Sequence, residues 1–330
     1  MQDMVTVFGG SGFIGAQVVR ALAKRGLRVR VAVRQPHLAH TMRLLGDVGQ
    51  VEVVQANVRN QASVARALSG AQACVNLVGI LYETGRQKFG AVHAMAAKTL
   101  ADAAKHEGVG QFVQMSALGA DPRSSSKYAR SKADGEAAVR AAFPDAVILR
   151  PSIVFGPGDD FFNRFAQMAV FSPFMPLIGG GGTRFQPVFV GDVARAVALA
   201  VTDPSAKGMT YELGGPGVFS FCQVLEHVLS VTGRRRFFVS LPFPAAAMIG
   251  KVCMLAAMTP IAPPLTDDQV ELLKSDNVVS GALPGLADLG ITAVAVEAIT
   301  PTYLYRFRKG GQFAGEAQAM ALVADIAPVI

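Results

Sequence analysis

The segment GGSGFIG, residues 9–15, follows directly on the apolar run 4–8 and leads into the apolar-periodic stretch 13–23. In such a strand–turn–helix unit, Gly9 permits the tight turn, Gly12 lets backbone approach a diphosphate, and Gly15 lets the helix pack against the strand. The diphosphate would lie at a helix N-terminus, where unpaired N–H groups and the helix dipole favour anions. The spacing is G-x-x-G-x-x-G rather than G-x-G-x-x-G, but the flanking elements are those that the motif requires. The segment predicts a dinucleotide site, with an ordinary glycine turn as the alternative.

The end of the second predicted strand indicates which dinucleotide is bound. This strand, 28–33, is followed by Arg34, which lies 19 residues after Gly15. An acidic residue near this position would bind the ribose hydroxyls of NAD, and none is present. Arginine is always charged and can bind a phosphate through two N–H donors. We therefore predict NADP(H) rather than NAD(H); the alternative is a solvated surface arginine, since Arg28 and Arg30 share the segment.

Strand and helix patterns alternate through the first half of the chain. Apolar strands separated by helices predict an α/β fold, a doubly wound parallel sheet of Rossmann type with helices on both faces. Further strands are predicted at 51–55, 73–77, 111–115 and 147–150, and helices between them at 63–68, 91–106 and 128–142.

In such a sheet, ligands bind beyond the carboxyl ends of the strands. This rule places 57–58 near the adenine and 77–79 near the ribose and nicotinamide, and it puts 151–153 at the same edge. Taken singly, each of these positions could be a plain loop residue. The predicted nucleotide-binding residues are Gly9, Ser11, Gly12, Phe13, Ile14, Gly15, Arg34, Asn57, Val58, Leu77, Val78, Gly79, Lys132, Pro151 and Ile153.

From Gly156 onward the alternation fades and glycine and proline become more frequent. We predict a dinucleotide-binding domain at 1–155 and a smaller α+β lobe at 156–330 that faces a partner or membrane, with a chain path that can interleave the two. The expected elements after residue 156 are a helix at 161–170, a strand at 186–190, a helix at 192–201 and charged, helix-like material at 267–309.

A second constellation is the Y-x-x-x-K pair Tyr128 and Lys132 at the start of a predicted helix. Residues four apart share a helix face, so the lysine ammonium could lower the tyrosine pKa and bind the nicotinamide ribose. Ser116, 12 residues before Tyr128 and at a strand end, could polarise a carbonyl. Ser116, Tyr128 and Lys132 are therefore the candidate catalytic residues. In the alternative, Tyr128 only packs and Lys132 only holds the ribose.

Composition limits the ligands and partners. The net charge of +7 and pI near 9.5 suggest a phosphorylated cofactor, nucleic acid or an acidic lipid surface. Nucleic acid is not expected, because the basic residues form no long tract and no recognition module is present. The three cysteines have no C-x-x-C spacing, so no metal site is predicted.

The mean hydropathy of +0.35 is high, and two apolar segments are candidates for membrane spans. Prolines and glycines interrupt 165–183, and prolines and Lys251 interrupt 237–266, so neither predicts a transmembrane helix. No signal or transit peptide is expected ahead of the first strand. The run 234–236, three arginines, stands directly before two phenylalanines, which suits contact with anionic lipid headgroups. Ordinary core of the smaller lobe is the alternative for that segment.

Several motifs beyond the glycine turn occur in a characteristic order. They are NLVG at 76–79, SA at 116–117, Tyr128 with Lys132, LRP at 149–151, FGP at 155–157, QPV at 186–188 and DVA at 192–194. Together they resemble the extended or atypical short-chain dehydrogenase/reductase superfamily, which includes the NAD-dependent epimerases and dehydratases. The resemblance covers roughly residues 4–215.

A narrower resemblance rests on VQMSALGAD at 113–121, SKYARSKADGE at 126–136, FGPGDDFFNRF at 155–165 and the glycine-rich segment before Thr183. These are similar to the family of nucleotide-binding accessory subunits of respiratory complex I, the proton-pumping NADH:ubiquinone oxidoreductase. The resemblance implies a tightly held NADPH outside the electron-transfer chain, a non-catalytic stabilising role on the peripheral arm near the membrane, and other complex I subunits as partners. It implies a peripheral location on the cytoplasmic side of a bacterial inner membrane, or on the matrix side in a mitochondrion. The C-terminal third carries no diagnostic motif.

Two other functions remain open. The first is an active NADPH-dependent reductase, epimerase or dehydratase acting on a small carbonyl compound, a nucleotide sugar or a quinone-pathway intermediate, for which Ser116, Tyr128 and Lys132 supply the groups. The second is a regulator that reports the NADPH/NADP ratio by changing partners.

Overall fold

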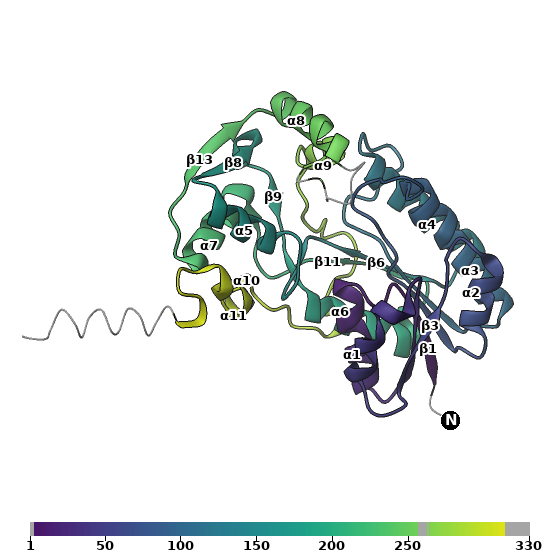
Figure 1. Cartoon of the computed structure of the whole chain (residues 1–330). Helices are drawn as coiled ribbons and strands as arrows, with labels where there is room; N and C mark the ends of the chain where they lie inside the picture. The colour runs from purple at the N-terminus through teal and green to yellow at the C-terminus, as the bar shows by residue number, and fades with distance from the viewer. Residues whose placement is uncertain (1–2, 257–262, 264, 314–330) are drawn as a thin grey trace, which may run out of the picture.

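The computed structural model describes residues 3–256, 263 and 265–313. Its centre is a seven-stranded sheet with the order β11-β6-β5-β4-β1-β2-β3 (Figure 1). All neighbouring strands in it run parallel. The strands are β1 Met4–Phe8, β2 Arg28–Val33, β3 Val51–Gln55, β4 Ala73–Asn76, β5 Gln111–Met115, β6 Val147–Pro151 and β11 Thr210–Leu213.

Helices cover both faces of this sheet because its strands are apolar on both sides. In β1, Val5 and Val7 join the buried core that α1 and α6 share, whereas Phe8 joins the core that α2, α3 and α4 share. This arrangement confirms the predicted doubly wound parallel sheet. The helices are α1 Phe13–Lys24, α2 Gln61–Leu68, α3 Ala96–His106, α4 Lys127–Ala142 and α6 Val190–Thr202.

Two predicted elements are shorter than expected. The helix predicted at 91–106 is α3 preceded by a π-helical turn, Gly90–Met95. The strand predicted at 186–190 is only β10, Val188–Phe189, because Pro187 has no N–H for a ladder hydrogen bond and α6 begins at Val190.

The helix-like material predicted over 267–309 is present only as short pieces. Beyond α9, Asp267–Leu272, the segment holds only short helical turns, among them α10 Val296–Ile299 and α11 Pro301–Leu304. Gly281 and Gly290 have φ of +73° and +66°, and such left-handed residues end helices.

A second part of the molecule lies beyond the carboxyl edge of the large sheet (Figure 1). Its centre is a parallel pair, β8 with β13, packed against α5 and α7. Helix α7 begins at a capping box formed by Ser220 and Gln223 and ends at Gly233 in the left-handed conformation. The further elements are β7 Val154–Phe155, α5 Phe162–Phe171, β8 Phe174–Ile178, β9 Arg184–Phe185, β12 Phe219–Ser220, α7 Phe221–Thr232, β13 Phe237–Leu241 and α8 Phe243–Ala256.

The chain returns to the large sheet after residue 155. Helix α6 covers one of its faces, and β11 pairs with β6 at its edge. The two parts thus interleave in sequence, and the division into 1–155 and 156–330 stays a prediction.

Among the described residues, no helix has the length and apolar character needed to cross a bilayer. In the same residues, no group of three or more His, Cys, Asp or Glu side chains is placed to hold a metal ion.

Candidate functional site

The glycine turn has the geometry that its residues were expected to give. Gly9 has φ +79°, and a Cβ on it would lie 3.1 Å from the Leu77 backbone carbonyl carbon. A Cβ on Gly15 would lie 2.3 Å from the Gly9 carbonyl oxygen, so only glycine lets α1 pack this closely on the turn. A Cβ on Gly12 would meet only that same oxygen, at 3.4 Å, which leaves the outer side of Gly12 open to a ligand.

The N-terminus of α1 fits an anion. The first N–H groups of a helix have no partner inside it, and here no side chain caps them and the first turn holds no acidic residue. Ser11 and Gly12 are exposed, whereas Phe13 and Ile14 are partly buried. These features are the ones that favour an anion such as a diphosphate at a helix N-terminus.

Arg34 lies beside this turn. Strands β1 and β2 pair with Phe8 opposite Ala32, and the Gly9 N–H donates to the Ala32 carbonyl at 3.4 Å. Arg34 is the first residue after β2, and its side chain is exposed. Within the described part of the chain its guanidinium has neither a hydrogen bond nor an ion pair, so it is free to bind a phosphate next to the turn.

The predicted adenine-side residues follow β3, the edge strand next to β2. Asn57 is exposed, and its Oδ1 accepts a hydrogen bond from the Arg59 N–H at 3.1 Å. Val58 is partly buried against the core that lies under α2 and α3. The oxygen of Asn57 is thus used within its own turn, and its contact with a nucleotide stays a prediction.

The segment 77–79 links the glycine turn to the Tyr128 site. The Leu77 N–H donates to the Phe8 carbonyl at 2.9 Å, which holds the segment against β1. A Cβ on Gly79 would lie 3.5 Å from Lys132 Nζ. The structure therefore brings Gly9, 77–79 and Lys132 into one continuous strip along the sheet edge.

Two predicted site residues at and just after the end of β6, Pro151 and Ile153, are used within the fold itself. The Pro151 carbonyl accepts a hydrogen bond from the Leu118 N–H at 3.0 Å, so its backbone holds a neighbouring loop. Ile153 is partly buried and packs on the core of the second part of the molecule. Their contact with a nucleotide stays a prediction.

Helix α4 presents Tyr128 and Lys132, and a distant segment holds its first turn. Ser126 caps the helix by accepting from the Ala129 N–H. The carboxylate of Asp268, at the start of α9, accepts from Ser126 Oγ at 2.8 Å and from the Tyr128 N–H at 3.1 Å. The second part of the molecule thus fixes the start of the helix that carries the Y-x-x-x-K pair.

Burial controls the protonation of this pair. It raises the pKa of Tyr128 to about 12, and the charge of Asp268 adds to the rise. It lowers the pKa of Lys132 to about 8, with the charge of Glu136 opposing. The expectation that Lys132 lowers the pKa of Tyr128 is therefore not met in this structure. The phenol stays protonated at neutral pH, and its hydroxyl makes no hydrogen bond to any described residue.

Ser116 is buried one residue beyond β5, and its hydroxyl donates to the Glu136 carboxylate. Glu136 also accepts two hydrogen bonds from the Arg150 guanidinium, at 2.9 and 2.6 Å, and these raise the pKa of Arg150. A serine hydroxyl has one proton to donate, and here Glu136 receives it. Polarising a carbonyl would require Ser116 to exchange this hydrogen bond, so its catalytic role stays a prediction.

His93 completes the site and was missed from the sequence. It is 2% exposed, lies edge-on to the Tyr128 ring with centroids 5.4 Å apart, and bonds Ser131 Oγ through Nδ1 at 2.8 Å. Its Nε2 accepts from the Ile80 N–H at 3.0 Å. Burial, followed by the charge of Lys132, lowers the pKa of His93 to about 3, so the ring is neutral.

Asp268 and Glu136 were missed as well. Glu136 stands four residues after Lys132 on the same helix, a spacing that could have indicated it. The sequence offered no comparable signal for Asp268, which is 140 residues from Tyr128.

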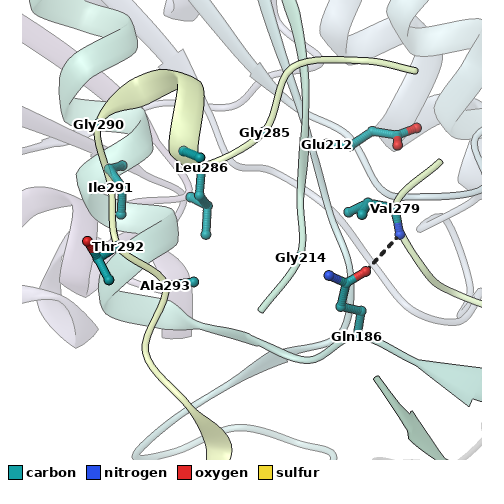
Figure 2. A pocket seen from close by; sticks show the side chains of 11 residues that line it. Gln186, Glu212, Gly214, Val279, Gly285, Leu286, Gly290, Ile291, Thr292 and Ala293 are labelled. Carbon is teal, nitrogen blue, oxygen red and sulfur yellow. Dashed lines mark hydrogen bonds between the residues drawn. The ribbon is translucent and has the colours of Figure 1, made fainter. Parts of the chain in front are cut away.

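A separate cavity of about 570 Å³ lies near the end of β11, between that strand and the segment 285–293 (Figure 2). Two of its polar side chains have partners: Gln186 Oε1 accepts from the Val279 N–H at 3.1 Å, and Glu212 accepts from the Ser280 N–H at 2.6 Å. No predicted site residue lines it. The cavity is therefore distinct from the strip formed by Gly9, 77–79 and Lys132.

Comparison with known proteins identifies related chains. Residues 5–214 match the model of the NAD dependent epimerase/dehydratase family. The chain is 35% identical over 333 residues to NADH dehydrogenase (ubiquinone) 1 alpha subcomplex subunit 9, mitochondrial, of Arabidopsis thaliana, which covers 98% of this chain and 83% of that protein. It is also 32% identical over 250 residues to the ceramide reductase of Caulobacter vibrioides, covering 76% of this chain and 77% of that protein.

Among solved structures, an NADPH-dependent quinone oxidoreductase from Escherichia coli, complexed with NADPH, superposes with a TM-score of 0.72. The identity is 21%, and the match covers 92% of this chain and 100% of that one. At this identity the likeness establishes the shared fold only.

Proposed function

The chain belongs to the NAD dependent epimerase/dehydratase family, and from that premise we propose that it is a non-catalytic accessory subunit of respiratory complex I. The observation that carries the proposal is the 35% identity to a protein named as a subunit of NADH dehydrogenase, over 98% of this chain. The family model ends at residue 214. The relative matches through the second part of the molecule as well, which is where a partner-binding surface would distinguish this subunit from an ordinary family enzyme.

We propose that the subunit holds NADPH as a structural group. The open side of Gly12 and the uncapped N-terminus of α1 fit the diphosphate, and the free guanidinium of Arg34 fits the additional phosphate of NADP(H). Lys132, 3.5 Å from the Cβ position of Gly79, would bind the nicotinamide ribose. A nucleotide bound along this strip would tie the glycine turn to α4 and so stabilise the large sheet as one body.

The proposed location is peripheral, at the junction of the complex with the membrane. It would be the cytoplasmic side of the inner membrane in a bacterium, or the matrix side in a mitochondrion. The relative from Arabidopsis thaliana is described as mitochondrial.

An active reductase is the second candidate, and the 32% identity to a ceramide reductase favours it. Bound NADPH would supply a hydride to a carbonyl carbon. Tyr128, whose pKa is about 12, would donate a proton to the carbonyl oxygen, and the ammonium of Lys132 would stabilise the resulting phenolate. The substrate would be a ceramide-like ketone or another small carbonyl compound, a nucleotide sugar or a quinone-pathway intermediate.

Affinity purification of a tagged chain from its own membranes, with mass spectrometry of the proteins and of the released nucleotide, tests the first proposal. We expect the core subunits of NADH:ubiquinone oxidoreductase and one equivalent of NADP(H). Recovery of nucleotide without any of these subunits would contradict the accessory-subunit role and favour the reductase. Recovery of NAD(H) alone would contradict the role given to Arg34.

A further inference from the structure

The second part of the molecule carries large apolar side chains on its surface. Phe171, Phe174 and Phe237 are 81%, 54% and 73% exposed. Phe174 and Phe237 are register partners in the β8–β13 pair, with ring centroids 6.3 Å apart. Val239, two residues along β13 and 47% exposed, points to the same side of its strand. We name these four side chains the phenylalanine face.

Two arginines lie beside this face. Arg235 and Arg236 directly precede Phe237, and Arg236 Nε donates to the Ala169 carbonyl at 2.8 Å, which holds its guanidinium near the end of α5. Arg235 is exposed. Among the described residues, no carboxylate lies within ion-pair distance of either guanidinium. Their charge is therefore available to a ligand outside the chain.

Acidic residues are absent from both segments that build the face. Neither 161–191 nor 227–266 contains an aspartate or a glutamate. A soluble surface normally mixes both signs of charge, and these segments carry only basic groups. The surface therefore complements a layer of negative charge with apolar material beneath it, which describes an anionic lipid bilayer.

Helix α8 extends the same pattern. It follows β13 and lies at the same end of the molecule as β8 and β13, away from β1 (Figure 1). Met248 and Val252, four residues apart on one helix face, are 68% and 62% exposed, and Lys251 beside them is exposed as well. Two different elements thus present apolar side chains next to basic ones.

We propose that the phenylalanine face and α8 seat this chain on the surface of an anionic lipid bilayer. The proposal rests on the peripheral location proposed above, and it adds which face meets the membrane. The phenylalanine rings would enter the headgroup layer, while Arg235, Arg236 and Lys251 would bind lipid phosphates.

Co-sedimentation of the purified full chain with vesicles tests this. We expect binding to vesicles of phosphatidylcholine mixed with phosphatidylglycerol, weakened by salt, and little binding to phosphatidylcholine alone. Arg235→Glu should weaken binding at least tenfold, since one basic residue near the surface contributes roughly fivefold and the reversal adds repulsion. Lys105→Glu, a charge reversal at an exposed position in α3, is the matched control and should leave binding unchanged.

The absence of tryptophan from the chain allows a reporter at a single position. Phe237→Trp should shift its emission to shorter wavelength when anionic vesicles are added, because the indole leaves water. Leu44→Trp, at an 82% exposed position in the 3₁₀ turn between β2 and β3, should show no shift. Both variants must melt at the wild-type temperature, as expected for exposed positions.

Each outcome of the vesicle and fluorescence experiments either supports or overturns the membrane proposal. A blue shift at position 237 together with loss of binding in Arg235→Glu supports it. Absence of vesicle binding, or binding with no shift at 237, overturns it. If Arg235→Glu instead lost complex I subunits in the affinity purification while vesicle binding was unchanged, the face would be a protein interface. Because vesicle binding uses the isolated chain, it can succeed or fail independently of membership in complex I.

Discussion

The ammonium of Lys132 lies 5.6 Å from the centre of the Tyr128 ring, close enough for a cation–π contact. Burial moves the two pKa values in opposite directions, Tyr128 up to about 12 and Lys132 down to about 8. Each shift favours the neutral form. At neutral pH the phenol is therefore protonated, while the lysine remains mostly charged although its surroundings disfavour charge. A ligand that accepts a hydrogen bond from Lys132 would relieve this penalty, which links nucleotide binding to stability.

Lys132→Met should therefore stabilise the nucleotide-free protein. The folded-state pKa of about 8 lies below the ordinary value of 10.5. The charged side chain thus destabilises the fold at pH values below 8, by roughly 3 kcal/mol. This destabilisation decreases as the pH rises above 8, and it is lost once the pH passes 10.5. Denaturant melts of wild type and Lys132→Met should differ at pH 7 and converge near pH 10, while Lys105→Met, an exposed control, should show no difference. A variant less stable than wild type at pH 7 would contradict the burial argument.

Tyr128→Phe separates the two candidate functions. The Tyr128 hydroxyl makes no hydrogen bond to any described residue, so removing it should change the melting temperature little. In an accessory subunit, assembly of complex I and its electron transfer should remain intact. In a reductase, turnover of a carbonyl substrate should fall by two orders of magnitude or more, because the proton donor is lost. NADPH oxidation with candidate ketones and complex I activity of membranes, measured for the same variant, decide between them.

Arg34→Asp should change the nucleotide preference. A charge-assisted contact from arginine to phosphate contributes about 1.5–3 kcal/mol, so NADP(H) should bind at least tenfold more weakly. NAD(H) should lose little, since the new carboxylate can accept from the ribose hydroxyls. Arg28→Asp, at the opposite end of β2, is the control and should leave both affinities unchanged. Calorimetric titration of both nucleotides measures this, and equal losses for both would refute the role of Arg34.

Alanine substitutions at two glycines of the turn should have different effects. The substitution at Gly15 should lower stability, and the one at Gly12 should weaken nucleotide binding. Gly15→Ala places a methyl group 2.3 Å from the Gly9 carbonyl oxygen, so it should lower the free energy of unfolding by about 3 kcal/mol. Gly12→Ala meets only one atom, at 3.4 Å, and has an ordinary φ of −78°. It should leave the melting temperature nearly unchanged while weakening nucleotide binding at least tenfold. Equal melting temperatures for the two variants would show that α1 does not depend on the close approach at Gly15.

The sheet and its glycine turn could be predicted from sequence because local patterns determine them. The apolar run 4–8 predicts a buried strand, and the glycine spacing predicts the turn that follows it. Helix α2 begins two residues earlier than predicted, at Gln61, because Asn60 caps it and the first turn contains no strongly apolar residue to reveal it. At 267–309, where glycines or prolines stand at 281, 284, 285, 290 and 301, the helix-like character of the sequence did not show that the helices would be short.

The surroundings of Tyr128 could not be predicted because they depend on tertiary contacts. His93 reaches the tyrosine from a π-helical turn, where the sequence predicted an ordinary helix, and Gly135 admits this turn because a Cβ there would lie 2.3 Å from the His93 carbonyl oxygen. Asp268 accepts a hydrogen bond from the Tyr128 N–H, although it lies more than a hundred residues away along the chain. The Y-x-x-x-K spacing predicted that Tyr128 and Lys132 share a helix face, but it could not reveal that burial and Asp268 raise the pKa of the phenol.

His93 should make the protein sensitive to mild acid. Its folded-state pKa of about 3 lies below the ordinary value of 6.5, because burial and the charge of Lys132 disfavour the imidazolium. A lowered pKa contributes stability that is complete above pH 6.5 and is lost as the pH falls toward 3. Between pH 6.5 and 5 the free energy of unfolding should fall by about 2 kcal/mol from this group. His93→Gln keeps hydrogen-bonding groups without a titrating ring, so its unfolding free energy should change less over this interval. His106→Gln removes an exposed imidazole and should retain the wild-type slope. Equal slopes for wild type and His93→Gln would show that this ring takes up a proton as easily in the folded chain as in the unfolded one.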